Sequence, residues 1–437
     1  MTVPTGWRAT QIVQGIHNSE LKPTDVADAF LQRIAEYDPV IQAFATVEPD
    51  MVRAQARWLD LQAERGARMP LHGVPVGVKD IIDVAGLPTI AGFEPYRDHI
   101  ADRDAAIVAS LRSLGALILG KTHTTQFAVG DPAPTKNPWN LSKSPSGSSA
   151  GSGAAVPAGM AAIALGSQTA GSMLRPAAFN GAVGFKPTFG WFSLEGVIPL
   201  CWSLDHLGLY GATVADVALV YDALVTARDE PAITSPGRPK IALLTEFLEM
   251  SSPDVASHIQ HVAESLEGAG AIVVETTMPE SFEHVFAIHQ VIFAAEMAAA
   301  HSANLGRYSE HYGPRIRTGV EAGTLIPAGY LVQAQRHRRT LSGVFDRFLR
   351  GFDALLLPTV STQACDRAET GDRRFQVPAT LLGTPALSLP TGLSSEGLPL
   401  ATQLIGRRGA DRELLGLAGW VTSVVPLIDG PELEKLG

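Results

Sequence analysis

The stretch from Ser144 to Thr188 (SPSGSSAGSGAAVPAGMAAIALGSQTAGSMLRPAAFNGAVGFKPT) constrains the fold of this chain more than any other. It is dense in Gly, Ser and Ala, yet its middle is too apolar for a flexible linker. Residues 147–150 (GSSA) form one small-residue turn, 156–165 predict a buried element, and 168–172 (QTAGS) form a second turn. Two such turns around one buried element can bring backbone N–H groups and hydroxyls together. We therefore expect a site in which the main chain itself approaches a substrate.

The composition indicates a globular protein and argues against two classes of binding partner. The 437 residues are 46% hydrophobic and 18% charged, and the net charge of −10 contains no block of like charges, which argues against nucleic acid or an anionic membrane. Only Cys201 and Cys365 are present, so neither a disulfide framework nor a cysteine-rich metal site is predicted. No signal peptide or membrane span is recognised, and we expect a soluble cytoplasmic protein with no membrane partner.

The alternation of helical and apolar strand patterns predicts an α/β fold. We expect one domain over residues 1–437, because no composition break divides the chain. Within it we distinguish N-terminal helices (1–70), a catalytic core (71–240), a helical cover region (240–350) and a return to the core sheet (351–437). The cover region is expected to begin with strands at 240–244 and 271–275 around a helix at 253–267, and to be mostly helical over 281–352.

Three common catalytic or binding patterns fit this chain poorly. Residues 147–151 (GSSAG) match the G-x-S-x-G elbow and would make Ser149 a nucleophile, but the last histidine, His337, lies in an Arg-rich helix about 100 residues from the end. No Gly-Lys-Ser/Thr follows the glycines, so a phosphate-binding loop is not predicted. The histidines are scattered without further ligands at useful spacing, and we predict no metal and no cofactor.

A lysine-based site remains. Lys79 ends the apolar run VPVGVK, and burial of its ammonium would lower its pKa and supply a neutral amine. Lowering the pKa from about 10.4 to about 7 corresponds to roughly 4–5 kcal/mol of differential stabilisation. The alternative is a salt bridge between Lys79 and a carboxylate such as Asp80, and the sequence alone does not decide between the two.

Three long motifs resemble the amidase signature family of Ser–Ser–Lys hydrolases. They are LHGVPVGVKDIIDVAGLPTIAG (71–92), SPSGSSAGSGAAVPAG (144–159) and QTAGSMLRPAAFNGAVGFKPTFG (168–190). The similarity continues through 203–224 and 383–406 and is weakest in the helical cover region. Within the family, the QTAGS-x-x-RP form looks most like the malonamidase-type branch. The resemblance implies a single amidase-signature domain with a central mixed β-sheet and helices on both of its faces.

The resemblance also implies a catalytic triad and an oxyanion hole. Ser172 corresponds to the nucleophile, Ser148 to a bridging serine preceded by an unusual cis peptide bond, and Lys79 to the base. The spacing of 24 residues between the two serines fits the family pattern. The backbone N–H groups that correspond to the oxyanion hole are those of Thr169, Ala170, Gly171 and Ser172.

The chain departs from much of the family at three positions. It has Gln168 in place of Asp, Ala170 in place of Gly, and Leu174 in place of an Arg two residues after the nucleophile. None of these changes removes a reacting group, so we expect an active enzyme. Arg175 corresponds to an arginine that reads a substrate carboxylate in the malonamidase-like branch; the alternative is that it pairs with a protein carboxylate. The tentative substrate-binding residues are Arg175, Gln168, Ser149 and Thr124.

The predicted function is hydrolysis of a small carboxamide, aryl amide or carbamate through a seryl acyl-enzyme. One alternative is a glutaminase-type amidotransferase subunit that supplies ammonia to a partner. Another is a urethanase-like carbamate or ester hydrolase. We expect a small-molecule amide or carbamate as the partner, and the N-terminal helices offer a surface for a homodimer.

Overall fold

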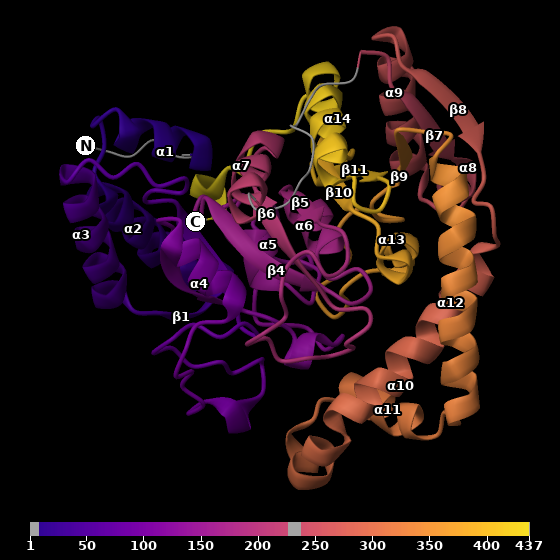
Figure 1. The fold of residues 1–437 in the computed structure, drawn as a ribbon, viewed down its shortest axis with the longest axis horizontal. Coiled ribbons are helices and arrows are strands. Elements are labelled where there is room, and N and C mark those ends of the chain that lie inside the picture. The colour runs from indigo at the N-terminus through magenta and orange to yellow at the C-terminus, as the bar shows by residue number, and fades with distance from the viewer. Residues whose placement is uncertain (1–7, 226–236, 437) are drawn as a thin grey trace.

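The computed structural model describes residues 8–225 and 237–436 (Figure 1). Parts of the predicted N-terminal and core segments fall on 1–7 and 226–236 and lie outside the described residues. The described chain is α/β, as predicted, with one mixed sheet of 11 strands. Their order is β1 (Phe44–Val47), β3 (Leu117–Thr122), β2 (Pro75–Lys79), β4 (Ile163–Gln168), β6 (His206–Gly211), β5 (Val183–Lys186), β10 (Ala386–Leu393), β11 (Pro399–Ile405), β9 (Ala354–Pro358), β7 (Lys240–Leu244) and β8 (Ile272–Thr276).

The sheet combines parallel and antiparallel pairs. Strands β3, β2 and β4 are parallel at one end, and β9, β7 and β8 are parallel at the other. The strands between them, and the edge strand β1, pair antiparallel. Every residue of β2, β3, β4 and β6 is buried, as expected for strands covered on both faces.

The helices occupy both faces of the sheet and both of its ends. Adjacent residues of β5 show the two faces: a Cβ at Gly184 would meet Ala177 of α6, whereas Phe185 packs edge-on against Tyr221 of α7. The helices in chain order are α1 (Ala9–His17), α2 (Pro23–Ile41), α3 (Pro49–Glu64), α4 (Ala106–Ser113), α5 (Ala150–Ala155), α6 (Leu174–Asn180), α7 (Val214–Leu224), α8 (Thr245–Glu249), α9 (Pro253–Gly268), α10 (Phe282–Tyr308), α11 (Pro314–Thr324), α12 (Ala328–Leu349), α13 (Val377–Leu382) and α14 (Asp411–Val424).

Short 3-10 helices complete the described structure. They are η1 (Glu94–Tyr96), η2 (Gln126–Ala128), η3 (Ser309–His311), η4 (Arg374–Gln376) and η5 (Leu433–Leu436). Within the described ranges, no helix combines the length and apolar character that crossing a membrane requires.

The long helices α10 and α12 and the shorter α11 form an arm at one side of the sheet (Figure 1). Helix α10 packs against both α11 and α12, and α10 and α12 both contact α13. The strands and helices predicted over 240–352 are confirmed, with bounds that agree within a few residues. The strands β7 and β8 of this region extend the core sheet, so the cover region begins as part of the sheet.

Candidate active site

Lys79 is the last residue of β2 and is completely buried. Its Nζ donates hydrogen bonds to Ser148 Oγ at 2.6 Å and to Ser167 Oγ at 2.7 Å. Burial in the sheet lowers the pKa of Lys79 to about 7, because an ammonium loses its hydration there. A lysine in this setting is partly neutral near pH 7 and can accept a proton.

The alternative salt bridge between Lys79 and Asp80 is not formed. Asp80 pairs instead with Lys121 on the neighbouring strand β3, at 2.9 Å, and both of these side chains are buried. Within the residues that the structure describes, no carboxylate lies within ion-pair distance of the Lys79 Nζ. The negative charge of Asp205 acts at longer range and raises the pKa of Lys79, against the larger effect of burial.

Ser148 lies in the loop before α5, and the Gly147–Ser148 peptide bond is cis. Arg175 of α6 holds this loop with its guanidinium: Nε donates to Ser146 Oγ at 2.9 Å and Nη2 donates to Gly147 O at 2.6 Å. Its Nη1 donates to Gly371 O at 3.0 Å. Arg175 is therefore bound to neutral oxygens and is not ion-paired with a carboxylate of the described residues. Within the described residues, the ion pair with a protein carboxylate is therefore not formed, whereas the contact of Arg175 with a substrate carboxylate stays a prediction, since Arg175 lines a cavity that Ser172 also lines.

Ser172 lies in the turn between β4 and α6, and Gln168 shapes this turn. Gln168 Oε1 accepts hydrogen bonds from the backbone N–H groups of Met173 at 2.9 Å and Leu174 at 3.1 Å, and its Nε2 donates to Thr380 Oγ1 at 2.9 Å. Both the oxygen and the nitrogen of its amide thus bind groups of the protein. The tentative assignment of Gln168 as a substrate contact is corrected here, because the side chain is buried and does not reach the cavity beside Ser172.

Two further tentative substrate contacts also lie elsewhere. Ser149 Oγ donates to the carbonyl oxygen of Ser167 and accepts from its N–H, both at 3.2 Å, and is buried. Thr124 Oγ1 donates to Thr125 O at 3.1 Å and lines a different cavity of about 420 Å³. The structure therefore corrects both assignments, because each hydroxyl is bound to backbone and neither residue lines the cavity beside Ser172.

The turn that carries Ser172 is held from its outer side. Thr169 Oγ1 donates to Asp205 Oδ1 at 2.5 Å, and Thr380 Oγ1 donates to Ala170 O at 2.7 Å. In the described chain, the N–H groups of residues 169–172 donate to no protein acceptor. Four unused N–H groups on one turn are a suitable arrangement for stabilising an oxyanion.

Asp205 belongs to the buried surroundings of this turn. Besides the Thr169 hydroxyl, it accepts hydrogen bonds from the N–H groups of Leu200 and Cys201, each at 2.9 Å. Burial raises the pKa of Asp205 to about 6, although these hydrogen bonds oppose the rise. Asp205 therefore has two effects: its charge raises the pKa of Lys79, and its hydrogen bond with Thr169 holds the turn that carries Ser172.

A cavity of about 500 Å³ opens beside Ser148, Thr169, Ala170 and Ser172. Its other walls include one face of α10, the loop 369–374, one side of α11, the segment 125–130, Arg175 and Leu200. The sequence predicts a helix over the α10 segment but shows no sign of which of its faces meets the site. The lining residues of greatest chemical interest there are Phe286, Gln290, Phe293, Met297 and Arg373.

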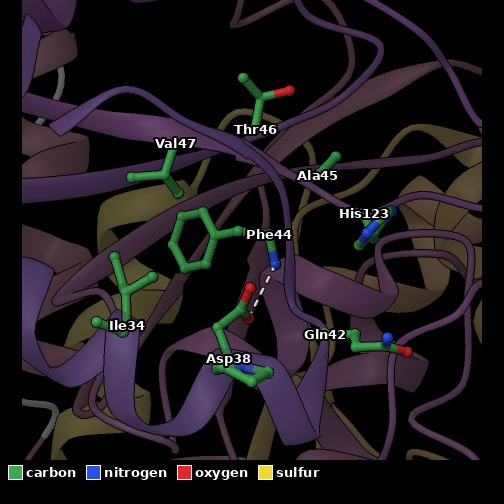
Figure 2. Close-up of a pocket in the computed structure, with 10 residues that line it drawn as sticks. Ile34, Asp38, Gln42, Phe44, Ala45, Thr46, Val47 and His123 are labelled. Atoms are coloured by element: carbon green, nitrogen blue, oxygen red, sulfur yellow. Dashed lines mark hydrogen bonds between the residues drawn. The ribbon is translucent and has the colours of Figure 1, made fainter.

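Another cavity, of about 440 Å³, lies between α2 and β1 (Figure 2). Its carboxylate, Asp38, accepts hydrogen bonds from the backbone N–H groups of Ala43 and Phe44 and so closes the turn between the two elements. His123 is the other ionisable residue in its wall, and burial lowers the pKa of His123 to about 4. Neither a serine nor a lysine lines this cavity.

Over the described ranges, no cluster of three or more His, Cys, Asp and Glu is arranged to hold a metal ion.

The Lys79–Ser148 pair lies next to the cavity that Ser172 also lines, on a fold that is shared with solved amidases. Residues 25–415 match the family described as Amidase, and the chain belongs to this family. A solved structure described as an amidase is 30% identical, with a TM-score of 0.89 over 96% of this chain and 100% of that one. The native peptide amidase from Stenotrophomonas maltophilia is 27% identical, with a TM-score of 0.85 over 98% of each chain.

Other relatives are components of an amidotransferase. One component of the glutamyl-tRNA(Gln) amidotransferase of Symbiobacterium thermophilum is 34% identical over 458 residues, which cover 91% of this chain and 93% of the relative. The corresponding component from Koribacter versatilis is 32% identical over 469 residues, which cover 94% of this chain and 96% of the relative. The relatives therefore include both amidases and amidotransferase components.

Proposed function

We propose that this chain hydrolyses the C–N bond of a small amide through an acyl-enzyme formed on Ser172. The observation that carries the proposal is the 2.6 Å hydrogen bond between Lys79 and Ser148, buried next to the cavity that Ser148 and Ser172 both line. Membership of the Amidase family supports the same chemistry.

The mechanism uses the two serines and the lysine in series. Neutral Lys79 accepts a proton from Ser148 while Ser148 accepts one from Ser172, whose oxygen attacks the amide carbonyl. The N–H groups of residues 169–172 stabilise the negative charge that develops on the carbonyl oxygen. The same side chains then return the proton to the leaving nitrogen, and water hydrolyses the acyl-enzyme.

A second candidate is an amidotransferase component that releases ammonia from glutamine for a partner. The curated relatives favour it, since several bacterial proteins of this kind are 31–34% identical over more than nine-tenths of this chain. Gln168 and Ala170 favour a free-standing hydrolase, because the resemblance associates the transferase members with the Asp-x-Gly-Gly-Ser form. Both candidates use the same nucleophile, and they differ in the acyl donor and in the need for a partner protein.

The purified chain should be tested against a panel of small amides, glutamine, a carbamate and an ester. Hydrolysis of an amide by the chain alone, lost in Ser172→Ala and retained in Ser142→Ala at an exposed serine, would support the hydrolase. Glutamine turnover that appears only with partner proteins would favour the transferase. Full activity of Ser172→Ala on every substrate would overturn both.

A further inference from the structure

Three side chains connect the cavity to the turn that carries Ser172. Arg373 Nη2 donates to Gln290 Oε1 at 2.9 Å, and Gln290 Nε2 donates to His289 Nδ1 at 3.1 Å. His289 Nε2 in turn lies 2.9 Å from the carbonyl oxygen of Thr169. A carbonyl only accepts, so Nε2 carries the proton and Nδ1 is free to accept from Gln290. Every bond in this chain thus runs in one direction, from the guanidinium to the Thr169 carbonyl.

The inner end of the chain acts on the predicted oxyanion hole. The carbonyl of Thr169 and the N–H of Ala170 belong to the same peptide group, so a donor on the carbonyl makes that N–H a stronger donor and fixes its plane. His289 is completely buried on α10, and burial lowers its pKa to about 3, which keeps it neutral with a single proton to donate. Thr380 makes the corresponding contact to the next peptide, through Ala170 O.

The outer end of the chain is a cation in the substrate cavity. Arg373 lines the cavity with its guanidinium 4.9 Å from the centre of the Phe293 ring, and Gln290 takes one of its N–H groups. The cavity wall holds three other arginines. Arg374 and Arg315 are ion-paired with carboxylates, and Arg175 donates hydrogen bonds from all three of its guanidinium nitrogens to the loop of Ser148 and to Gly371 O. Arg373 has no carboxylate within 4 Å in the part of the chain that the structure describes. It therefore retains donors that can face a ligand.

We propose that Arg373 binds a carboxylate of the amide substrate, and that Gln290 and His289 are positioning residues that join this subsite to the oxyanion turn. The inference rests on the proposed function and assigns it a substrate class, amides that carry a carboxylate. A carboxylate held by the guanidinium orders Gln290, which orders His289 and thereby the Thr169–Ala170 peptide. The cover region in this way takes part in the reaction through α10.

The subsite is tested by protection of Ser172 against a neutral fluorophosphonate, with succinate and butyramide as competing probes. Succinate should protect the wild type at a concentration at least about 10-fold below butyramide, because a guanidinium–carboxylate pair is worth more than about 1.4 kcal/mol. Arg373→Met should lose this preference. The control Arg367→Met, just before the loop 369–374 and outside the cavity, should keep it. A preference that survives in Arg373→Met, or is absent from the wild type, would overturn the subsite.

The positioning role is tested by the maximal rate of phosphonylation of Ser172 in two variants of His289. His289→Leu removes the donor to Thr169 O and should slow the reaction about 10-fold or more. His289→Gln keeps an N–H at the same reach and should restore most of the rate. Equal rates in the two variants would overturn the role, as would a loss that follows their melting temperatures. If the wild-type chain is not labelled on Ser172 at all, the proposed function is wrong. If it is labelled, the competition experiment tests the Arg373 subsite, and the His289 variants test the positioning role.

Discussion

Replacing Lys79 by methionine should stabilise the fold at low pH while it abolishes activity. The pKa of Lys79 falls from 10.5 to about 7 on burial, so the folded chain disfavours the ammonium. A lysine whose folded pKa lies below its unfolded value destabilises the protein fully below the folded pKa, and the penalty disappears as the pH rises toward the unfolded value. The full penalty corresponds to roughly 5 kcal/mol, since each pKa unit is worth about 1.4 kcal/mol.

The pH dependence isolates this effect from the loss of contacts. Lys79→Met also removes donors from Ser148 and Ser167, but that loss is nearly independent of pH. Between about pH 6 and pH 9, the wild type should regain about 2–3 kcal/mol of unfolding free energy relative to Lys79→Met. Urea unfolding of both proteins across this range measures the difference, and Lys22→Met, at an exposed lysine, controls for the change of side chain.

The direction in which the stability difference changes with pH tests whether Lys79 is buried as a neutral amine. A stability difference between wild type and Lys79→Met that stays constant from acid to alkaline pH would mean that the buried amine is not the neutral base. A difference that grows in favour of the variant as the pH rises would refute the reasoning outright.

Three further predictions concern the surroundings of the triad. Asp205→Asn removes a negative charge that raises the pKa of Lys79, so the acid limb of the kcat–pH profile should move to lower pH; an unmoved or raised limb would contradict this. Gln168→Leu leaves two buried N–H groups unpaired and should cost about 2 kcal/mol or more in urea unfolding, whereas an unchanged midpoint would show that the turn is held by other contacts. In Gly171→Ala the new Cβ would clash with Gln376 Oε1, so either the buried Gln376, which donates to Thr359 O, or the turn of Ser172 must shift, and kcat should fall; near wild-type kcat together with an unchanged urea midpoint would refute the close packing of this turn.

Much of the fold follows from local sequence patterns. The apolar run ending at Lys79 predicts a buried strand, and the small-residue turns around 156–165 predict a site built from backbone. The strand order does not follow, because the pairing of β10 with β5 joins segments about 200 residues apart and depends on tertiary packing.

The residues of the proposed triad were easier to single out in the sequence than those that line the rest of the cavity. Lys79, Ser148 and Ser172 lie in motifs whose spacing is distinctive, whereas Arg373 is one of two adjacent arginines in a loop with no pattern of its own. Gln168 illustrates the opposite error: a polar residue near the proposed nucleophile suggests a substrate contact, yet its amide is used to close the turn. Side-chain direction in such turns is set by contacts with segments distant in sequence, here Thr380.

The most direct test of the account is to identify the residue that becomes acylated. The enzyme should be mixed with p-nitrophenyl acetate, quenched in acid during the burst, digested and analysed by mass spectrometry. The account predicts acetylation of Ser172 in the wild type, with the adduct strongly reduced in Lys79→Met and absent from Ser172→Ala. Acetylation of Ser149 instead, or an unchanged adduct on Ser172 in Lys79→Met, would contradict it.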